Sequence, residues 1–368
     1  MSKALLRDEL LGASLRTEHE LLLAVAADGQ RDDLRSVSDL VGAEGLDWEY
    51  VRRTAHRHGL FVLLHSALAA VEPGTVPREV AGRFRLERGA LRLGVDASAI
   101  DLEALATSFE EAAVPMMSFK GLVLARRAYG DIYLRPAGDI DLLVRPEDMV
   151  PAYDLISARG YRAYDSSKRD EHITRERLAS HLKTYKGVTF VANRGTIDLH
   201  ATLDDAPYRS GLSPQEVWEN SIPVEVKTRS IATLADEVHL RYLCFHAAKH
   251  AWVKLSWIVD VDRLVRSVPQ IDWKAVLASS ERTRSGRVLH LGLFLASRLL
   301  GTRLLDDVET TLSADPALAP LGSRVVANMI DGPSSKDIKK LRARLFRTPG
   351  ERLAYVRHRL LRRYGLGG

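Results

Sequence analysis

Apolar residues recur three and four positions apart through most of the first hundred residues of the chain. This spacing places them on one face of a helix. Three such segments lie within 1–105, and the Gly- and Pro-containing stretch VEPGTVPRE at 71–79 separates two of them. We therefore expect residues 1–105 to form an N-terminal helical region.

Short apolar runs replace this pattern after residue 105, and they alternate with stretches of helical spacing. Helices are predicted at 122–129, directly after a turn at Lys120 and Gly121, and between Pro146 and Gly160, while 165–186 is a polar interval. Strands are predicted at 114–119, 140–144, 187–192 and 195–203, with a further hairpin or strand at 221–234. Because strands and helices alternate in this way in mixed α/β units, we expect an α/β core over 106–234.

Helical spacing returns at residue 235 and continues to the end of the chain. We expect a C-terminal helical domain over 235–334 and a basic helical tail over 335–368. The tail carries eleven Lys or Arg and two acids, so it is strongly basic while the whole chain has a net charge of only +5. An amphipathic helix with a solvated basic face explains this charge, and a contact with nucleic acid, anionic lipid or an acidic partner is the alternative.

Composition narrows the class of protein. The chain has 368 residues, of which 46% are apolar and 27% charged, as in a globular protein of two or three domains. It has no apolar run of 18 residues and no signal-peptide pattern, so we expect neither a membrane span nor secretion. The single cysteine, Cys244, excludes an internal disulfide and fits the reducing cytoplasm, where we expect the protein to be.

Two aspartates, Asp139 and Asp141, accompany the apolar run at 140–144 and point to the same side if the segment is a strand. Like charges this close are tolerated where a cation lies between them or where water solvates them. Asp198 lies in another predicted strand, and the three carboxylates would meet if the two strands were neighbours. Such a cluster suits Mg²⁺, and two ions would serve phosphoryl or nucleotidyl transfer. Capping of turns is the structural alternative for aspartates at strand ends.

The segment SFKGLVLARRAYGDIYLRPAGDIDLLVRPEDMVPAYDLISARGYR at 118–162 closely resembles the signature of the uncharacterised bacterial nucleotidyltransferase family, a branch of the polymerase-beta-like nucleotidyltransferase superfamily. The resemblance covers roughly 47–265, and FHAAKHAWVKLSWIVDVDRLV at 245–265 is similar to the C-terminal helical signature of that family. The residues that match in order are Lys120-Gly121, Tyr129-Gly130, Arg135, Asp139-Ile140-Asp141-Leu142-Leu143-Val144 and Asp198-Leu199-His200.

This resemblance implies an α+β fold, with a small mixed-sheet nucleotidyltransferase core flanked by N-terminal and C-terminal helical regions. It implies transfer of a nucleoside monophosphate, most simply AMP from ATP, to a hydroxyl or similar group of a small-molecule, peptide or protein acceptor, with release of pyrophosphate. Asp139, Asp141 and Asp198 would be catalytic and would hold Mg²⁺, with two ions expected. The nucleotide-binding residues would be Lys120, Gly121, Arg135, His200, Lys249 and His250.

Three of these residues also have a simpler explanation. Lys120 could be an exposed turn lysine, Arg135 could neutralise the aspartates, and His200 could be a hydrogen-bonded structural histidine. The phosphate-binding turn also departs from the Gly-Gly or Gly-Ser of the wider superfamily, since Lys120-Gly121 takes its place. His246 and His250 have the i, i+4 spacing of zinc ligands, but no third ligand is evident, so we do not expect zinc.

Two further functions stay open. A nucleotidyltransferase-like protein could bind a nucleotide, peptide or partner protein without transferring anything, although the intact trio of acids argues against this. The basic tail could direct the protein to nucleic acid, but the mildly acidic remainder of the chain disfavours a long nucleic-acid groove. The sequence identifies neither the acceptor nor the preferred nucleotide.

Overall fold

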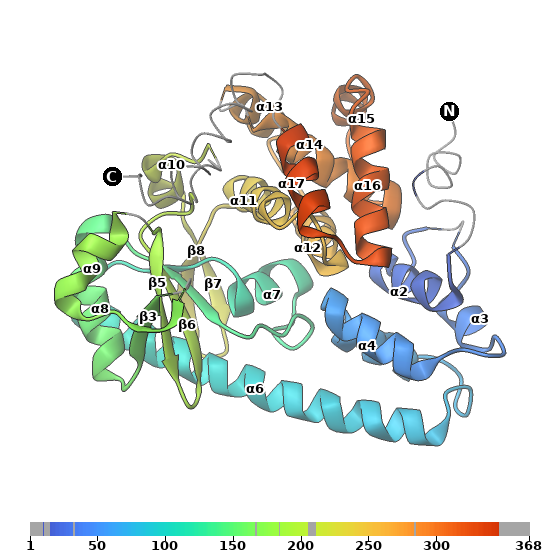
Figure 1. Ribbon diagram of the computed structural model, residues 1–368, viewed down its shortest axis with the longest axis horizontal. Coiled ribbons are helices and arrows are strands. Elements are labelled where there is room, and N and C mark those ends of the chain that lie inside the picture. Colours follow the sequence, from blue (N-terminus) through green and yellow to red (C-terminus); the bar gives the residue numbers. More distant parts are fainter. Residues whose placement is uncertain are drawn as a thin grey trace. The chain divides into compact units, whose positions relative to one another are not determined.

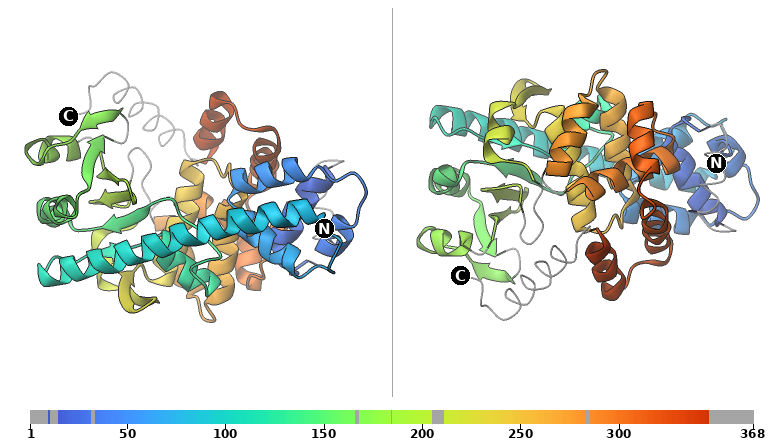
Figure 2. Two further views of the ribbon diagram at one scale, coloured as in Figure 1. Left: turned by 90° about the horizontal axis from the view of Figure 1, so that it is seen from below. Right: turned by 90° about the horizontal axis from the view of Figure 1, so that it is seen from above.

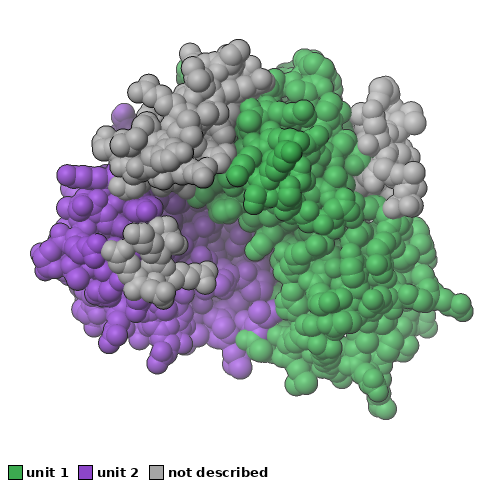
Figure 3. Space-filling model, viewed as in Figure 1, with its two compact units in different colours: residues 1–90, 243–349 green, residues 91–242, 350–368 purple. Residues whose placement is uncertain are grey.

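A computed structural model describes residues 10, 15–31, 34–165, 168–183, 185–204, 211–282 and 285–345 (Figure 1). Contacts divide these residues into two compact units (Figure 3). Unit 1 combines the described parts of 1–90 and 243–349, and unit 2 comprises those of 91–242. Two helices cross the division: α6 (Arg78–Glu111) begins in unit 1 and ends in unit 2, and α11 (Asp236–Lys249) does the reverse.

Unit 1 is helical and joins the two ends of the chain. The N-terminal helix α2 contacts α12 and the π-helical segment η2, which lie more than 200 residues later. Its apolar side chains Leu21, Leu22 and Val25 are buried. The elements of unit 1, apart from the crossing helices, are α2 (Thr17–Ala27), α3 (Val37–Val41), α4 (Trp48–His58), α5 (Phe61–Ala69), α12 (Leu255–Ser267), α13 (Trp273–Arg282), α14 (Gly286–Leu295), η2 (Ala296–Leu300), α15 (Asp306–Ser313), α16 (Leu318–Asp331) and α17 (Ser335–Arg344).

Unit 2 is built on a six-stranded mixed sheet with the order β1-β2-β6-β5-β3-β4. Strands β2 and β6 are parallel, and every other neighbouring pair is antiparallel. The strands of the sheet are β1 (Met117–Ser118), β2 (Ile140–Leu143), β3 (Arg162–Asp165), β4 (Lys168–His172), β5 (Gly187–Ala192) and β6 (Gly195–His200). A separate hairpin is formed by β7 (Ile222–Val226) and β8 (Arg229–Thr233).

Helices complete unit 2. Besides the parts of α6 and α11, these are α7 (Gly121–Tyr129), the short 3₁₀ turn η1 (Pro146–Asp148), α8 (Met149–Ala158), α9 (Arg175–Leu182) and α10 (Pro214–Glu219). Helices α8 and α9 lie side by side, and α7 contacts β2 and β7 (Figure 1). Phe109, Ile156, Phe190 and Leu199 meet in one hydrophobic core between helices and sheet. The mixed α+β class expected from the sequence is therefore confirmed.

Several predicted elements differ from the observed ones in length. The strand predicted at 114–119 is only Met117–Ser118, since Pro115 has no N–H to donate to a ladder. The strand at 195–203 ends at His200, and the polar interval 165–186 contains β4 and α9. Helix α6 continues past residue 105 to Glu111 without a proline to stop it. The division of the chain into four regions, 1–105, 106–234, 235–334 and 335–368, remains a prediction.

The basic tail is described only in part. Helix α17 supplies its first ten residues, Ser335–Arg344, and the predicted continuation over 346–368 lies outside the described residues. No helix in the described ranges is long and apolar enough to cross a membrane.

Strand β5 provides a direct test of the core, because two adjacent side chains on it have opposite environments. Phe190 is fully buried, whereas Val191 is 42% exposed. Phe190→Ala should lower the free energy of unfolding by about 3–5 kcal/mol through lost burial and a cavity. Val191→Ala should cost less than about 1 kcal/mol. Urea denaturation followed by circular dichroism would measure both, and equal losses would contradict the assigned faces of β5.

Candidate active site

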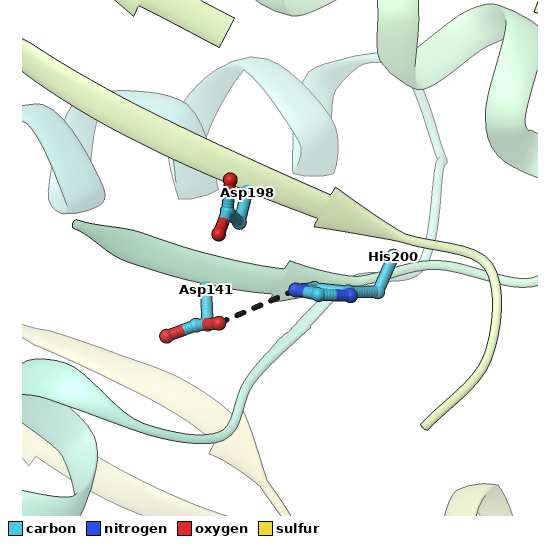
Figure 4. A group of neighbouring side chains, drawn as sticks. All are labelled: Asp141, Asp198 and His200. Carbon is cyan, nitrogen blue, oxygen red and sulfur yellow. Dashed lines mark hydrogen bonds and ion pairs between the residues drawn. The ribbon is translucent and has the colours of Figure 1, made fainter. Parts of the chain in front are cut away.

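The parallel pairing of β2 with β6 assembles the candidate site. In this register Asp141 lies opposite Asp198, and Leu143 lies opposite His200. Because side chains alternate along a strand, Asp198 and His200 share the face on which Asp141 lies, while Leu142 and Leu199 are buried in the core. One ligand atom from each of Asp141, Asp198 and His200 lies within 4.8 Å of the others (Figure 4). The two strands are therefore neighbours, which was the condition under which their carboxylates would meet.

Asp141 is the most buried acid of the cluster, with 1% of its surface exposed. Its Oδ1 lies 2.6 Å from the Lys120 ammonium and 3.3 Å from His200 Nε2. Burial alone would raise the pKa of this carboxyl, but Lys120 and the His200 hydrogen bond outweigh it and hold the pKa well below its usual range. Asp141 therefore carries a full negative charge at neutral pH.

Lys120 reaches the cluster from the turn before α7. The turn depends on Gly121, whose φ of 54° is in the left-handed region and whose added Cβ would lie 3.4 Å from the Asp139 carbonyl oxygen. Burial lowers the pKa of Lys120, but the Tyr242 oxygen and the Asp141 carboxylate raise this pKa by more, so the net shift is upward. Lys120 is consequently a charged and largely enclosed ammonium, not an exposed turn lysine.

Asp139 directly precedes β2 and is half-buried. Burial and the charge of Asp141 raise its pKa to about 6, although Lys120 partly offsets them. Among the described residues it is not in the group whose ligand atoms lie within 4.8 Å, where His200 stands instead. The metal-binding role predicted for Asp139 therefore remains a prediction.

Asp198 is held by a neighbour that the sequence analysis did not identify. Thr189 lies opposite it on β5, and its hydroxyl donates a 2.7 Å hydrogen bond to Asp198 Oδ1. The alternation along β5, in which Val188 and Phe190 are buried, is the signal that assigns Thr189 to the other face. This bond fixes one oxygen of Asp198, which is itself only half-buried.

His200 is buried and neutral. Burial and the charge of Lys186 lower its pKa to about 4, against the opposing effect of Asp141. The Phe119 ring packs on it edge to face at 5.3 Å. Its Nδ1 is buried without a hydrogen-bond partner in the described part of the chain. Since Nε2 is the nitrogen that faces Asp141, a cation held by this cluster would bind Nε2, and the imidazole proton would then lie on Nδ1.

These donors fit a divalent cation. Asp141 and Asp198 offer carboxylate oxygens, which Mg²⁺ prefers, and His200 offers a nitrogen that also suits Mn²⁺ and other transition metals. The nucleotide-binding role of His200 remains a prediction, and its position beside Asp141 also suits a metal ligand.

The other predicted site residues lie in different parts of the chain. Arg135 is half-buried in the loop between α7 and β2, where its charge lowers the pKa of Asp139. Lys249, at the end of α11, and His250 belong to unit 1, and their nucleotide-binding role remains a prediction. The His250 ring lies 4.8 Å from that of His246 and 5.2 Å from that of Trp257.

Comparison with known proteins identifies the family. A family model described as "Uncharacterised nucleotidyltransferase" matches residues 44–301, which is most of the chain. No curated protein matches. A solution structure of the antibiotic-resistance factor ANT(2'')-Ia matches with 12% identity over 73% of this chain and 97% of the other, at a TM-score of 0.31. A likeness of that size supports no conclusion about this chain.

The family match includes every motif of the cluster, from Lys120-Gly121 through the Asp139–Asp141 pair to Asp198 and His200. The fold brings Asp141, Asp198 and His200 together around a buried lysine. The chain therefore belongs to the uncharacterised nucleotidyltransferase family.

Proposed function

We propose that this protein is a metal-dependent nucleotidyltransferase that moves a nucleoside monophosphate from a nucleoside triphosphate, most simply ATP, to a hydroxyl of a small-molecule, peptide or protein acceptor. The observation that carries the proposal is the pairing of Asp141 with Asp198 on adjacent parallel strands, with the Lys120 ammonium 2.6 Å from Asp141. Two carboxylates and a fixed cation at one point suit a reaction in which charge on phosphate oxygens must be neutralised.

The donor triphosphate would bind beside the turn at Lys120. An ammonium has three N–H groups, so Lys120 can donate to Asp141 and still donate to a phosphate oxygen. Gly121 begins α7, and the free N–H groups and dipole of a helix N-terminus favour anions. Arg135, whose charge already acts on Asp139, is suited to a bidentate contact with phosphate.

The metal would be held by Asp141 and Asp198, with His200 or Asp139 as a further ligand; Mg²⁺ is the first candidate and two ions remain the expectation. When bound, Mg²⁺ supplies positive charge to the phosphate oxygens of the donor. Asp141 contributes a permanent negative charge, because Lys120 and His200 keep it ionised.

Asp198 is the residue that we assign to the acceptor. Thr189 uses one lone pair of Asp198 Oδ1, so the second lone pair of Oδ1 can bind the metal while Oδ2 accepts the proton of the acceptor hydroxyl. As the acceptor oxygen forms a bond to the α-phosphorus, its proton passes to Asp198 and the bond from the α-phosphorus to the bridging oxygen breaks. Pyrophosphate leaves with that oxygen.

The cytoplasm remains the proposed location of the protein, because its single cysteine, Cys244, cannot form an internal disulfide and is buried.

A non-catalytic binding protein is the second function to be tested. It would bind a nucleotide at the same residues but would not cleave it. Incubating the protein with triphosphates labelled at the α-phosphorus and with pools of hydroxyl-bearing small molecules and peptides separates the two functions. Transfer of label with release of pyrophosphate supports the enzyme, and intact label despite tight binding supports the binding protein.

Asp198→Asn is the sharpest test of the acid cluster. An asparagine retains an oxygen that can accept the Thr189 hydrogen bond, so the fold should persist while one negative charge is lost. We expect Mg²⁺-dependent ATP binding to weaken and transfer to fall by roughly a hundredfold or more. Calorimetric titration and the label assay would measure these losses.

The matched control is Glu147→Gln, which removes an exposed acid from η1 six residues after Asp141. It should leave binding and transfer unchanged. Asp141→Asn is a weaker test alone, because it leaves the buried Lys120 charge unpaired and should lower the melting temperature as well. Full ATP binding and transfer in Asp198→Asn would refute the assigned site.

Metal binding should also depend on pH through Asp139. Its folded pKa of about 6 lies above the ordinary value of 3.8, so the carboxyl takes up a proton as pH falls through 6 and loses its charge. Since protons compete with metal, affinity for Mn²⁺ should be constant above about pH 7 and should fall roughly tenfold per unit below pH 6. Mn²⁺ alone is the suitable probe, because triphosphate itself takes up a proton near pH 6.

Titrations of Mn²⁺ from pH 5 to 8 with the unaltered protein and Asp139→Asn would check this dependence. The variant should bind more weakly at pH 8 and should lose the step near pH 6. His200, with a pKa of about 4, stays neutral over this range and contributes no step. The same step in both proteins would exclude Asp139 as its origin.

A further inference from the structure

Helix α6 carries large apolar side chains on its solvent side. Leu86 is 78% exposed, Leu93 71% and Ile100 63%. Two other large apolar side chains in the described residues are exposed, Leu305 at 60% and Val191 at 42%. Three of the five thus lie on one helix, although exposed leucines elsewhere in a protein are usually scattered singly.

The spacing of these residues makes them one continuous stripe. They are seven residues apart, which is two helical turns, so they lie above one another along α6. Four positions lie between them on the same face. Gly89, Ala90 and Ala97 are small and exposed, and the fourth, Asp96, is half-buried and paired with Lys227. Large apolar residues alternating with small ones allow a second helix to approach closely and to place its own large side chains over the small ones. We call the six apolar and small residues on this face the α6 stripe: Leu86, Gly89, Ala90, Leu93, Ala97 and Ile100.

Charge along the helix favours a particular occupant. Residues 78–93 include five arginines and two acids, whereas 94–111 include five acids and no lysine or arginine. Arg85 and Glu103 lie on the same edge of the α6 stripe, by their helical positions, at opposite ends. Asp96 is already paired with Lys227, whereas Glu103 accepts hydrogen bonds from the N–H and the hydroxyl of Thr228, which is uncharged. Arg85 and Glu103 are therefore the two charged residues that bear most on the choice of partner.

A second copy of the chain running antiparallel satisfies both features. With its two-fold axis at Leu93, Leu86 of each copy faces Ile100 of the other, and the basic half of each α6 lies beside the acidic half of the other. The same edges meet in this arrangement, so Arg85 lies opposite Glu103 of the second copy. A parallel pair would instead bring like halves together, with Arg85 near Arg83 and Glu103 near Asp101.

We propose that the α6 stripe is an antiparallel homodimer interface. The helix is continuous from Arg78 to Glu111 (Figure 2), so a single element carries the whole stripe. The interface is separate from the acid cluster and does not depend on the proposed reaction.

Sedimentation velocity and light scattering test the association. The unaltered chain should have twice the chain mass of 40.9 kDa and should dissociate on dilution. Leu93→Glu should weaken the dimer by about tenfold or more, since it replaces a leucine at the centre of the interface by a charge that the partner helix would bury. The control Leu305→Glu changes an equally apolar side chain, 60% exposed, outside α6, and should leave the dimer intact.

Charge reversal and cysteine cross-linking test the orientation. Arg85→Glu and Glu103→Arg should each weaken the dimer, and the double variant should restore it. The only native cysteine, Cys244, is buried, so single introduced cysteines can be oxidised cleanly. Leu93→Cys should cross-link to itself. Leu86→Cys should not, because two such residues would be about 21 Å apart, but it should cross-link to Ile100→Cys in a mixture.

The outcomes are distinct. A chain that stays monomeric at all concentrations would overturn the proposal and would indicate that the α6 stripe binds a different protein. A dimer that survives Leu93→Glu would also overturn the proposal. Self-cross-linking of Leu86→Cys would show parallel helices and would overturn the orientation. Circular dichroism of Leu93→Glu should match the unaltered chain because the position is exposed, which separates loss of association from loss of folding.

Discussion

The buried ion pair between Lys120 and Asp141 is the interaction on which the site depends. Taking both charges out of water is costly, and the 2.6 Å contact compensates only because each partner is fixed by its own element. Gly121 permits the turn that positions the lysine, and the pairing of β2 with a strand on either side, β1 and β6, positions the acid. The pair keeps Asp141 ionised, and the resulting negative charge is one reason why Asp139 next to it holds its proton up to about pH 6. Two aspartates at one site therefore have pKa values shifted in opposite directions.

Much of unit 2 could be predicted because its elements follow local patterns. The strand at 187–192 matches β5 residue for residue, and the helix at 122–129 differs from α7 by one residue. Where prediction fell short, the pairing partner decided the structure. Strand β4 and helix α9 arise in a polar interval with no periodic signal, and β4 exists because it pairs with β3. In unit 1, the packing of α2 on α12 joins segments whose individual patterns contain no information about each other.

The same distinction applies to the site. Motif and alternation indicated Asp141, Asp198 and their common face, because these follow from the side-chain period of a strand. The register that places them opposite each other, and Thr189 beside Asp198, is a property of the assembled sheet. Sequence also assigned Asp139 to the metal and His200 to the nucleotide, whereas distance groups His200 with the two acids. The predicted strand at 140–144 already begins after Asp139, but strand bounds do not give the distances that group His200 with Asp141 and Asp198.

The parallel pairing of β2 and β6 also determines when the site can exist. Antiparallel neighbours can be joined by a short turn, but a parallel pair requires a long crossover, and here α8, β3, β4, α9 and β5 all lie between the two strands. Asp141 and Asp198 can therefore come together only after that whole segment has been synthesised, and contacts so distant in sequence form slowly. During synthesis, a nascent chain that ends before β6 contains the Asp-Ile-Asp motif and Lys120 but lacks their counterpart. A cluster that needs both strands is thus confined to molecules whose sheet contains β2 and β6 together.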